Sequence, residues 1–227
     1  MLKGVVFDLD GTLVDSLSHS FSAFNHGFTQ HGGKFHQPEE IMAYFGPGEG
    51  DIFTRVLGTE KAAAAYDSYR KFFDEKIGEM PLHKGVEELL TTLEANRIPF
   101  SIFTGRGWDT TELILKHHRI LDRFITVVSS DHVNLSKPSP EGLHLALSRM
   151  KMQPKEVLFV GDSSQDIRAA HLAKSIGVAA LWDSRASREE LALQKPHYWA
   201  GVPMEIWEIF SADPTNPSRR SPKQSTS

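Results

Sequence analysis

Apolar side chains recur every three or four positions from residue 16 to residue 80, which is the spacing of amphipathic helices. Leu17, Phe21, Phe24 and Phe28 form the first such stripe, and it stops at two glycines. Three more helices are predicted: one from Pro38 towards Phe45, one around Ile52–Leu57, and one over Glu60–Ile77. No strand pattern interrupts these residues, so the segment 16–80 is predicted to be a small helical bundle.

The rest of the chain shows a different pattern, in which short apolar runs alternate with helical stretches. Strands are predicted at Val5–Phe7, Pro99–Phe103, Phe124–Val128, Val157–Val160 and Val178–Trp182. Helices are predicted at Gly85–Asn96, Trp108–His118, Ser139–Met150 and Ser164–Ser175. This order predicts an α/β fold with a doubly wound parallel sheet. Residues 1–15 and 81–211 would form the core domain, and 212–227, rich in Pro and Ser, a disordered tail.

Composition narrows the class of protein. A chain of 227 residues is long enough for one α/β domain with a smaller insertion. The formal charge of −4 gives no basic excess, so no nucleic-acid partner is expected. The absence of cysteine excludes a thiolate nucleophile and a Cys-ligated zinc site. Without a signal peptide or a membrane-spanning apolar run, we expect a cytoplasmic protein, monomeric or weakly dimeric, with no membrane partner.

Two carboxylates, Asp8 and Asp10, follow the first predicted strand directly. Side by side at the end of a buried strand they would repel each other unless a cation lay between them. Hard oxygen ligands without His or Cys nearby suit Mg²⁺ better than Zn²⁺. For a bare Asp-x-Asp-Gly, a strand followed by an ordinary Asp/Gly turn would be the better interpretation, and the residues that follow it change this ranking.

Three further residues follow later strands in the same way: Thr104, Lys137 and Asp162. Each alone has a structural explanation, as a turn hydroxyl, a surface amine or a helix cap. Open parallel sheets bind their ligands beyond the carboxyl ends of the strands, where all of these residues would meet. The coincidence of four such positions predicts one site.

These residues lie in four motifs that resemble those of the haloacid dehalogenase (HAD) superfamily, in the expected order. The motifs are D-L-D-G-T-L-V-D-S at 8–16, F-T-G-R at 103–106, S-K-P-S-P at 136–140 and G-D-S-S-Q-D at 161–166. The resemblance spans Leu2 to about Phe210 and includes the phosphoglycolate phosphatase-like and β-phosphoglucomutase-like branch. It implies a HAD-like Rossmannoid core with a C1-type helical cap, and residues 16–80, here termed the cap segment, occupy the place of that cap.

The resemblance also implies a role for each acid. Asp8 would attack phosphorus, and Asp10 would protonate the leaving oxygen and then activate water. Mg²⁺ would be held by the carboxylates of Asp8 and Asp162 and by the backbone carbonyl of Asp10. Asp166 would orient the Lys137 ammonium or a metal-bound water.

Other residues would contact the substrate. The phosphoryl oxygens would be held by Thr104, the Gly105 backbone N–H and Lys137. Arg106 is predicted to join this phosphate-binding group, although it could instead be a surface residue at a helix start, as could Trp108. The glycine-rich stretch 46–50 would be either a specificity loop facing the core or a flexible turn between helices.

The predicted function is a Mg²⁺-dependent phosphatase for a small phosphorylated metabolite of the phosphoglycolate or sugar phosphate type, acting through an aspartyl-phosphate. A β-phosphoglucomutase-like sugar phosphomutase shares all four motifs and is the alternative. It ranks second because residues 16–80 show no basic hinge motif. A phosphate-binding module without activity would fit the loss of Asp8, Asp10 or Lys137, but all three are present.

Overall fold

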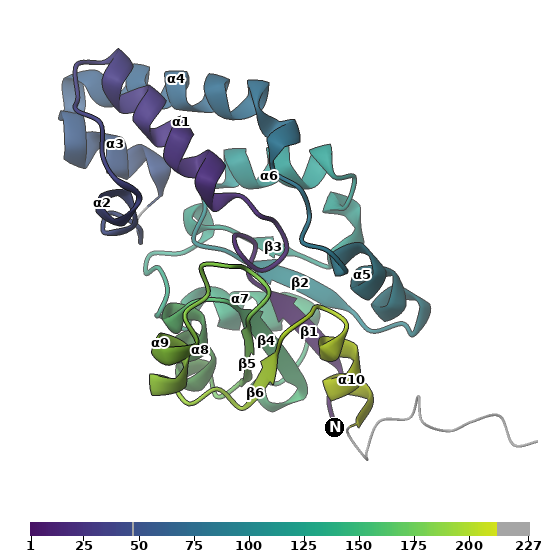
Figure 1. Ribbon diagram of the computed structural model, residues 1–227. Coiled ribbons are helices and arrows are strands. Elements are labelled where there is room, and N and C mark those ends of the chain that lie inside the picture. Colours follow the sequence, from purple (N-terminus) through teal and green to yellow (C-terminus); the bar gives the residue numbers. More distant parts are fainter. Residues whose placement is uncertain (47, 213–227) are drawn as a thin grey trace, which may run out of the picture.

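A sheet of six parallel strands forms the centre of the protein (Figure 1) in a computed structural model that describes residues 1–46 and 48–212. The strands are β1 (Gly4–Phe7), β2 (Phe100–Phe103), β3 (Val127–Val128), β4 (Val157–Gly161), β5 (Ile176–Ala180) and β6 (Tyr198–Ala200). The predicted α/β class with a parallel sheet is therefore confirmed.

The strand order is β3-β2-β1-β4-β5-β6, so the winding direction reverses beside β1. From β1 the chain first moves outwards through β2 and β3, and then crosses to the other side through β4, β5 and β6. The carboxyl ends of β1 and β4 flank the reversal, which is where doubly wound sheets open a crevice for ligands.

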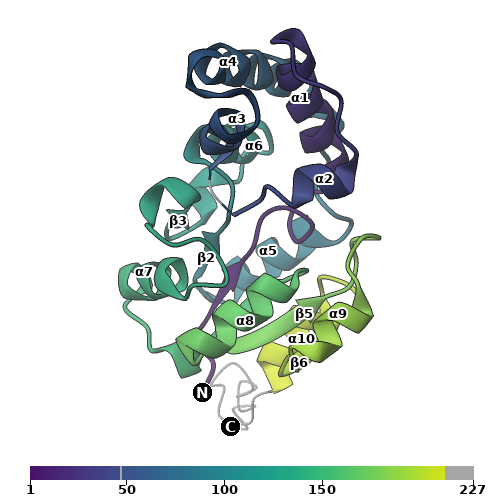
Figure 2. The same cartoon turned by 90° about the vertical axis from the view of Figure 1, so that its left-hand side faces the viewer.

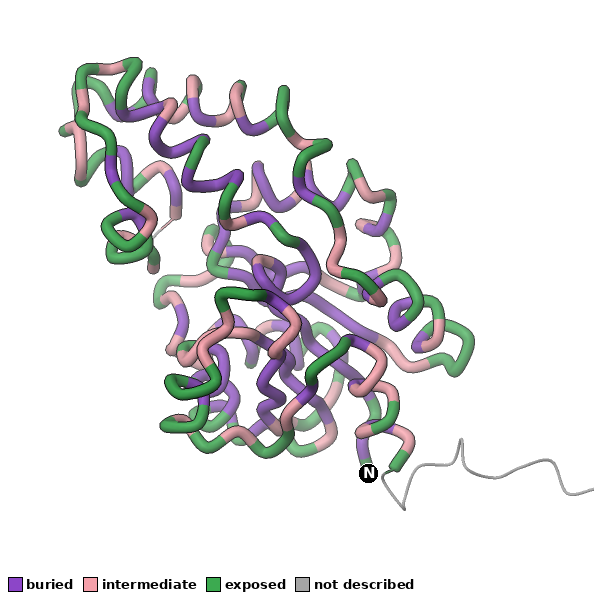
Figure 3. Tube along the Cα trace, viewed as in Figure 1, coloured by how far each residue is buried: buried purple, intermediate pink, exposed green. Residues whose placement is uncertain are grey.

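Helices cover both faces of the sheet: α5 (Val86–Ala95), α6 (Trp108–His117), α7 (Glu141–Met150), α8 (Ser164–Ala173), α9 (Arg188–Leu193) and α10 (Glu205–Ala212). Successive side chains of β1 point to opposite faces. Val6 packs into the cluster formed with α7 and α8, whereas Val5 and Phe7 pack into the larger cluster that includes α5 and α10. Figure 2 shows α8 in front of the sheet and α10 behind it. All four residues of β1 are buried (Figure 3), which explains why its sequence is continuously apolar.

The cap segment contains α1 (Leu17–Gln30), α2 (Pro38–Met42), α3 (Glu49–Leu57), α4 (Thr59–Glu75) and a 3₁₀ turn at Ile77–Glu79. These helices lie together beyond one end of the sheet (Figure 1). Their contacts are largely aromatic: the ring of Phe24 in α1 lies 4.8 Å from that of Tyr69 in α4 and 5.5 Å from that of Phe53 in α3. The regular stripe of aromatic residues thus forms the interior of a small helical bundle.

Several boundaries differ from those predicted. The strand expected at Phe124–Val128 is only Val127–Val128, because a 3₁₀ turn at Leu121–Arg123 delays its start. The strand expected at Val178–Trp182 begins at Ile176 and ends at Ala180, and Trp182 turns away to donate its indole N–H to the Thr12 carbonyl.

The part of the chain after β5 was only partly anticipated. Strand β6 and helices α9 and α10 were not predicted, although Ile206 and Phe210 in α10 have helical spacing and are both buried. Helix α10 extends to Ala212, so the predicted tail does not begin there, and its remaining residues, 213–227, lie outside the described part of the chain. Within residues 1–46 and 48–212 no helix is long and apolar enough to cross a membrane.

Candidate active site

The first two acids of the site follow β1. Asp8 donates its backbone N–H to the Val160 carbonyl at 2.8 Å, which fixes the end of β1 beside β4. Gly11 then turns the chain with a φ of +75°, in the left-handed region that favours glycine. A Cβ at Gly11 would lie 2.3 Å from Oδ2 of Asp162, so glycine is also needed there for the two loops to approach.

The other two acids follow β4: Asp162 lies in the loop that leads into α8, and Asp166 lies in the first turn of that helix. The Ser163 hydroxyl accepts a hydrogen bond from the Asp166 backbone N–H at 3.3 Å, and the Asp166 carboxylate accepts one from the Ser163 backbone N–H at 3.1 Å. This reciprocal capping box turns Asp166 back towards the sheet. Gly161 makes room for it, because a Cβ there would lie 2.3 Å from the Asp166 carboxyl carbon.

Lys137 joins these two pairs of acids. It lies in the loop before α7, and its Nζ is 2.7 Å from Asp8 Oδ1 and 2.6 Å from Asp166 Oδ1. The ammonium also lies over the rings of Phe103 and Phe159, at 5.0 and 5.4 Å. Burial by itself would lower the pKa of Lys137, but Asp166 and Asp8 outweigh that effect and raise it, so the amine stays charged.

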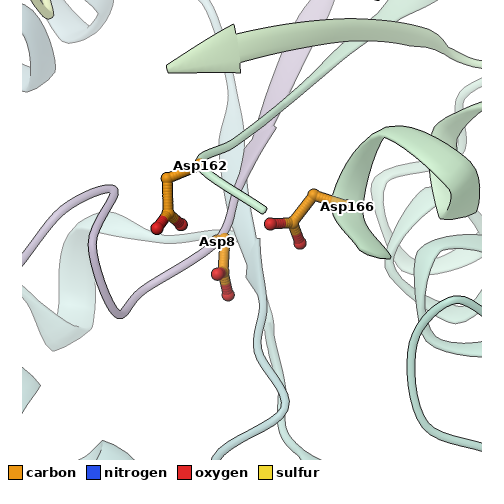
Figure 4. Close-up of side chains that lie close together, drawn as sticks. All are labelled: Asp8, Asp162 and Asp166. Carbon is orange, nitrogen blue, oxygen red and sulfur yellow. The ribbon is translucent and has the colours of Figure 1, made fainter. Parts of the chain in front are cut away.

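Three carboxylates gather around this position. Asp8, Asp162 and Asp166 each offer an oxygen within 4.8 Å of the others, and their side chains lie close together (Figure 4). Burial raises the pKa of Asp8 to about 7, with Lys137 opposing the shift and the carboxylates of Asp166 and Asp10 adding to it. Burial, with the carboxylates of Asp166 and Asp8 adding to it, also raises the pKa of Asp162 well above its ordinary value. The raised pKa values indicate that the single ammonium of Lys137 supplies too little positive charge to balance these buried carboxylates.

A divalent cation fits that deficit. Three ionised carboxylates balanced by one ammonium leave two negative charges, and their oxygens are hard ligands that suit Mg²⁺. Asp162 is already oriented, since its Oδ1 accepts a hydrogen bond from the Thr12 hydroxyl at 3.2 Å. The geometric cluster consists of Asp8, Asp162 and Asp166, whereas the Asp10 carboxylate turns towards another partner.

That partner is Arg106. Its Nη2 lies 2.7 Å from Asp10 Oδ1, and its Nε lies 3.1 Å from both oxygens of the same carboxylate. The side chain is buried, so the alternative of a surface residue is wrong for Arg106. Trp108, two residues later, is half-buried at the start of α6 and does not border the cavity described below. Burial alone would lower the pKa of the Arg106 guanidinium, but Asp10, Tyr69 and Glu49 raise it.

Thr104 and Gly105 follow β2 and complete the predicted set. Thr104 is buried, and its backbone N–H is held by the Val128 carbonyl at 2.9 Å. Its hydroxyl accepts a hydrogen bond from the Arg106 backbone N–H at 3.1 Å. Gly105 is exposed and has no neighbour within 4 Å of the position of a Cβ. Both residues border the same cavity as Asp8 and Lys137.

That cavity has a volume of about 360 Å³ and lies between the core and the cap segment. All the predicted site residues except Asp166, which lies behind Lys137, border it. The sequence analysis assigned no individual role to several other lining residues: Glu49 and Ser20 from the cap segment, and Gln165 and Arg185 from the core. Glu49 belongs to the glycine-rich stretch considered as a specificity loop, and it begins a helix rather than a flexible turn.

Comparison with known proteins identifies the family. A family model described as haloacid dehalogenase-like hydrolase matches residues 5–181. The chain belongs to this family. It is 31% identical over 211 residues to the pyrophosphatase PpaX of Bacillus mycoides, covering 92% of this chain and 97% of that protein. The PpaX of Bacillus cereus strain B4264 is 29% identical over 214 residues, with the same coverage.

Solved structures share the fold of this HAD-like hydrolase. A predicted phosphoglycolate phosphatase from Haemophilus somnus gives a TM-score of 0.81 at 23% identity, covering 92% of this chain and 98% of that one. CbbY from Rhodobacter sphaeroides, solved with phosphate, gives 0.78 at 23% identity, covering 91% and 96%. The predicted family, fold and enzyme class, a HAD-family phosphatase, are therefore confirmed.

Proposed function

We propose that this protein is a Mg²⁺-dependent phosphatase that hydrolyses a small phosphomonoester through a phosphorylated Asp8. The observation that carries the proposal is the position of Lys137, whose ammonium joins Asp8 to Asp166 at the carboxyl ends of β1 and β4. A phosphomonoester dianion is repelled by a free carboxylate, so attack by Asp8 requires this positive charge beside it. Mg²⁺ bound by Asp8, Asp162 and the Asp10 carbonyl, with Asp166 beside them, would neutralise the remaining charge.

In the proposed reaction Asp8 attacks phosphorus and the leaving alcohol departs on the opposite side. Thr104, the Gly105 N–H and Lys137 hold the phosphoryl oxygens. Asp10 donates a proton to the leaving oxygen and later removes one from the water that hydrolyses the aspartyl-phosphate. Arg106 stays beside the leaving group, because it lines the cavity and holds the Asp10 carboxylate.

The cap segment would close over the substrate and exclude bulk water during these steps. Its contribution to the cavity wall favours a phosphatase over a phosphomutase. The described lining residues from the cap segment include no Lys, Arg or His: they are Leu17, Ser20, Phe24, Met42, Phe45, Gly46, Glu49 and Ile52. A mutase must hold a sugar bisphosphate, whose second phosphate would need a cation on this side. A monoester with an uncharged leaving group makes no such demand.

The PpaX relatives introduce another substrate, since their name describes pyrophosphate hydrolysis. Pyrophosphate would place an anionic leaving group against the cap-segment wall. Arg106 is the cation nearest to Asp10 there, and its donors are already occupied by protein acceptors. We therefore rank neutral leaving groups first and include pyrophosphate as the comparison.

The test is phosphate release from p-nitrophenyl phosphate, phosphoglycolate, glycerol 2-phosphate, hexose phosphates and pyrophosphate, with Mg²⁺ and with EDTA. We expect turnover that requires Mg²⁺ and favours a monoester without a second anionic group. Conversion of a hexose 1-phosphate to its 6-phosphate without release of phosphate would instead establish the mutase. If the protein released phosphate from none of these compounds in the presence of Mg²⁺, the proposed phosphatase would be refuted.

A further inference from the structure

Glu49, the first residue of α3, places a buried carboxylate of the cap segment against the core. Its Oε2 accepts a hydrogen bond from the Gly107 backbone N–H at 2.7 Å, and its Oε1 accepts one from the Thr110 hydroxyl at 2.6 Å. Oε1 also lies 3.6 Å from Nη1 of Arg106. The side chain is only 7% exposed.

The partners of Glu49 lie at the start of core helix α6. Gly107 is the N-cap of that helix and has no side chain to satisfy the free N–H groups of the first turn. The Glu49 carboxylate accepts the N–H of Gly107 itself, at the positive end of the helix dipole, and Asp131 accepts the N–H of Trp108. Because Gly107, Thr110 and Arg106 all belong to the core, Glu49 keeps these partners only while the cap segment is closed. Opening would return a charged carboxylate to water.

Arg106 links Glu49 to the active site, because it contacts both Glu49 and Asp10. Cap-segment groups surround its guanidinium: Nη2 donates to the Ser20 hydroxyl at 2.6 Å, Nη1 to the Tyr69 hydroxyl at 3.3 Å, and the Phe73 ring lies 5.0 Å away. On the core side, Nη1 also donates to the Thr110 hydroxyl at 3.4 Å, and Nε and Nη2 donate to Asp10. A residue held in this way cannot move without moving the carboxylate that it binds.

We propose that Glu49 is a positioning residue that makes the placement of the Asp10 carboxylate depend on closure of the cap segment, acting through Arg106. The inference rests on the proposed phosphatase reaction, in which Asp10 protonates the leaving group. Without Glu49 the guanidinium loses a cap-segment partner, and Asp10 is no longer held where the leaving oxygen departs.

The leaving group provides the test. p-Nitrophenolate departs without a proton, whereas an alkoxide requires one, so kcat/KM for an alkyl phosphomonoester depends on Asp10 and kcat/KM for p-nitrophenyl phosphate does not. We expect Glu49→Gln to lower kcat/KM for the best alkyl substrate of the panel by roughly tenfold or more, and that for p-nitrophenyl phosphate by less than about threefold. Glu60→Gln, on an exposed position of α4, serves as the matched control and should change neither.

A second variant perturbs the contact between Glu49 and Gly107 by a change in the core. A Cβ at Gly107 would lie 2.5 Å from Glu49 Oε2, while the backbone there has a φ of −65° and a ψ of 158°, which alanine adopts freely. Gly107→Ala should therefore displace Glu49 and reproduce the selective loss on alkyl substrates. In a Glu49→Ala background the same change should alter kcat/KM by less than about twofold, because the partner it displaces is already gone.

Each outcome decides the inference. Equal losses on aryl and alkyl substrates would mean that Glu49 only stabilises the fold, and no loss on either would mean that it does not position Asp10; both overturn the proposal. If Glu49→Gln does not fold, as judged by circular dichroism, Gly107→Ala and its dependence on residue 49 give the answer. An inactive wild-type protein would refute the phosphatase itself, which is a different result from an active enzyme whose variants lack selectivity.

Discussion

The ammonium nitrogen of Lys137 lies 2.7 Å from Oδ1 of Asp8, although the two residues come from distant parts of the sequence. Both side chains are buried, with 6% and 11% of their surfaces exposed. A charge in such surroundings is stable only when an opposite charge accompanies it. Removing the ammonium, which also serves Asp166, therefore affects both the chemistry and the stability of the fold.

Lys137→Met is expected to abolish turnover and to destabilise the Mg²⁺-free protein. It keeps the length and apolar body of the side chain, but leaves Asp8 and Asp166 without their cation. Breaking a buried ion pair in this way lowers the free energy of unfolding by about 3 kcal/mol or more. Urea denaturation in EDTA measures the change.

Lys116→Met is the matched control for that experiment. Lys116 forms an ion pair with Glu112 at 3.1 Å on the surface of α6, and its side chain is 59% exposed. Exposed pairs of this type contribute about 0.5 kcal/mol. Equal destabilisation by the two variants would contradict the central electrostatic role assigned to Lys137.

Asp8→Asn is expected to lower turnover by at least about a thousandfold, because an amide cannot act as the nucleophile. The exchange is nearly isosteric, and the high pKa of Asp8 shows that its charged form is disfavoured by burial. The melting temperature in EDTA should therefore stay unchanged or rise. Asp74→Asn, on the exposed face of α4, controls for the loss of a carboxylate elsewhere. Substantial activity in Asp8→Asn would exclude Asp8 as the nucleophile.

The strand ends could be predicted because this sheet is buried on both faces. Val5–Phe7 and Val157–Val160 form unbroken apolar runs, and the first acid after each run, Asp8 or Asp162, lies at the crevice. The alternation of such runs with helical stretches predicted that the strands are parallel. Strand β6 gave no such signal, because it is short, lies at the sheet edge and leaves Tyr198 exposed.

The contacts of Arg106 could not be predicted in the same way. Its position after β2 indicated that it lies near the site, but its partners Ser20 and Tyr69 come from α1 and α4. Which residues of those helices meet the core depends on how the whole cap segment packs against the sheet. Periodicity identifies the buried face of a helix but not its partner. The contacts of Glu49 with Gly107, Thr110 and Arg106 could not be predicted for the same reason.

Magnesium affinity is expected to fall with acidity in the neutral range. Asp8 has a pKa of about 7 in the folded, metal-free protein, against 3.8 as the ordinary value, so the metal must displace a proton below pH 7. For one such proton, binding is about tenfold weaker at pH 6 than at pH 8. Isothermal titration calorimetry in buffers of different ionisation enthalpy measures both the affinity and the proton released.

The raised pKa of Asp8 also predicts how the stability of the metal-free protein changes with pH. Because the folded value exceeds the unfolded one, the folded protein holds more protons between about pH 4 and pH 7, and the contribution of Asp8 to stability declines as pH rises through that window. Added Mg²⁺ should therefore raise the melting temperature more at pH 8 than at pH 6. An equal increase at both pH values would contradict the assignment of Asp8 as a metal ligand.

Packing within the cap segment is open to an independent test at Gly27, where α1 meets its neighbours. A Cβ there would lie 2.6 Å from the Phe53 ring and 2.8 Å from the Ala65 carbonyl oxygen. Although alanine favours helices, Gly27→Ala is expected to lower the free energy of unfolding by about 1–3 kcal/mol, because backbone cannot yield to the added methyl group. Gly78→Ala, where a Cβ meets nothing within 4 Å, should leave stability within about 0.5 kcal/mol of the wild type. Chemical denaturation of the two variants compares them directly, and a Gly27→Ala protein as stable as the Gly78→Ala protein would show that α1 does not pack against α3 and α4 as closely as described.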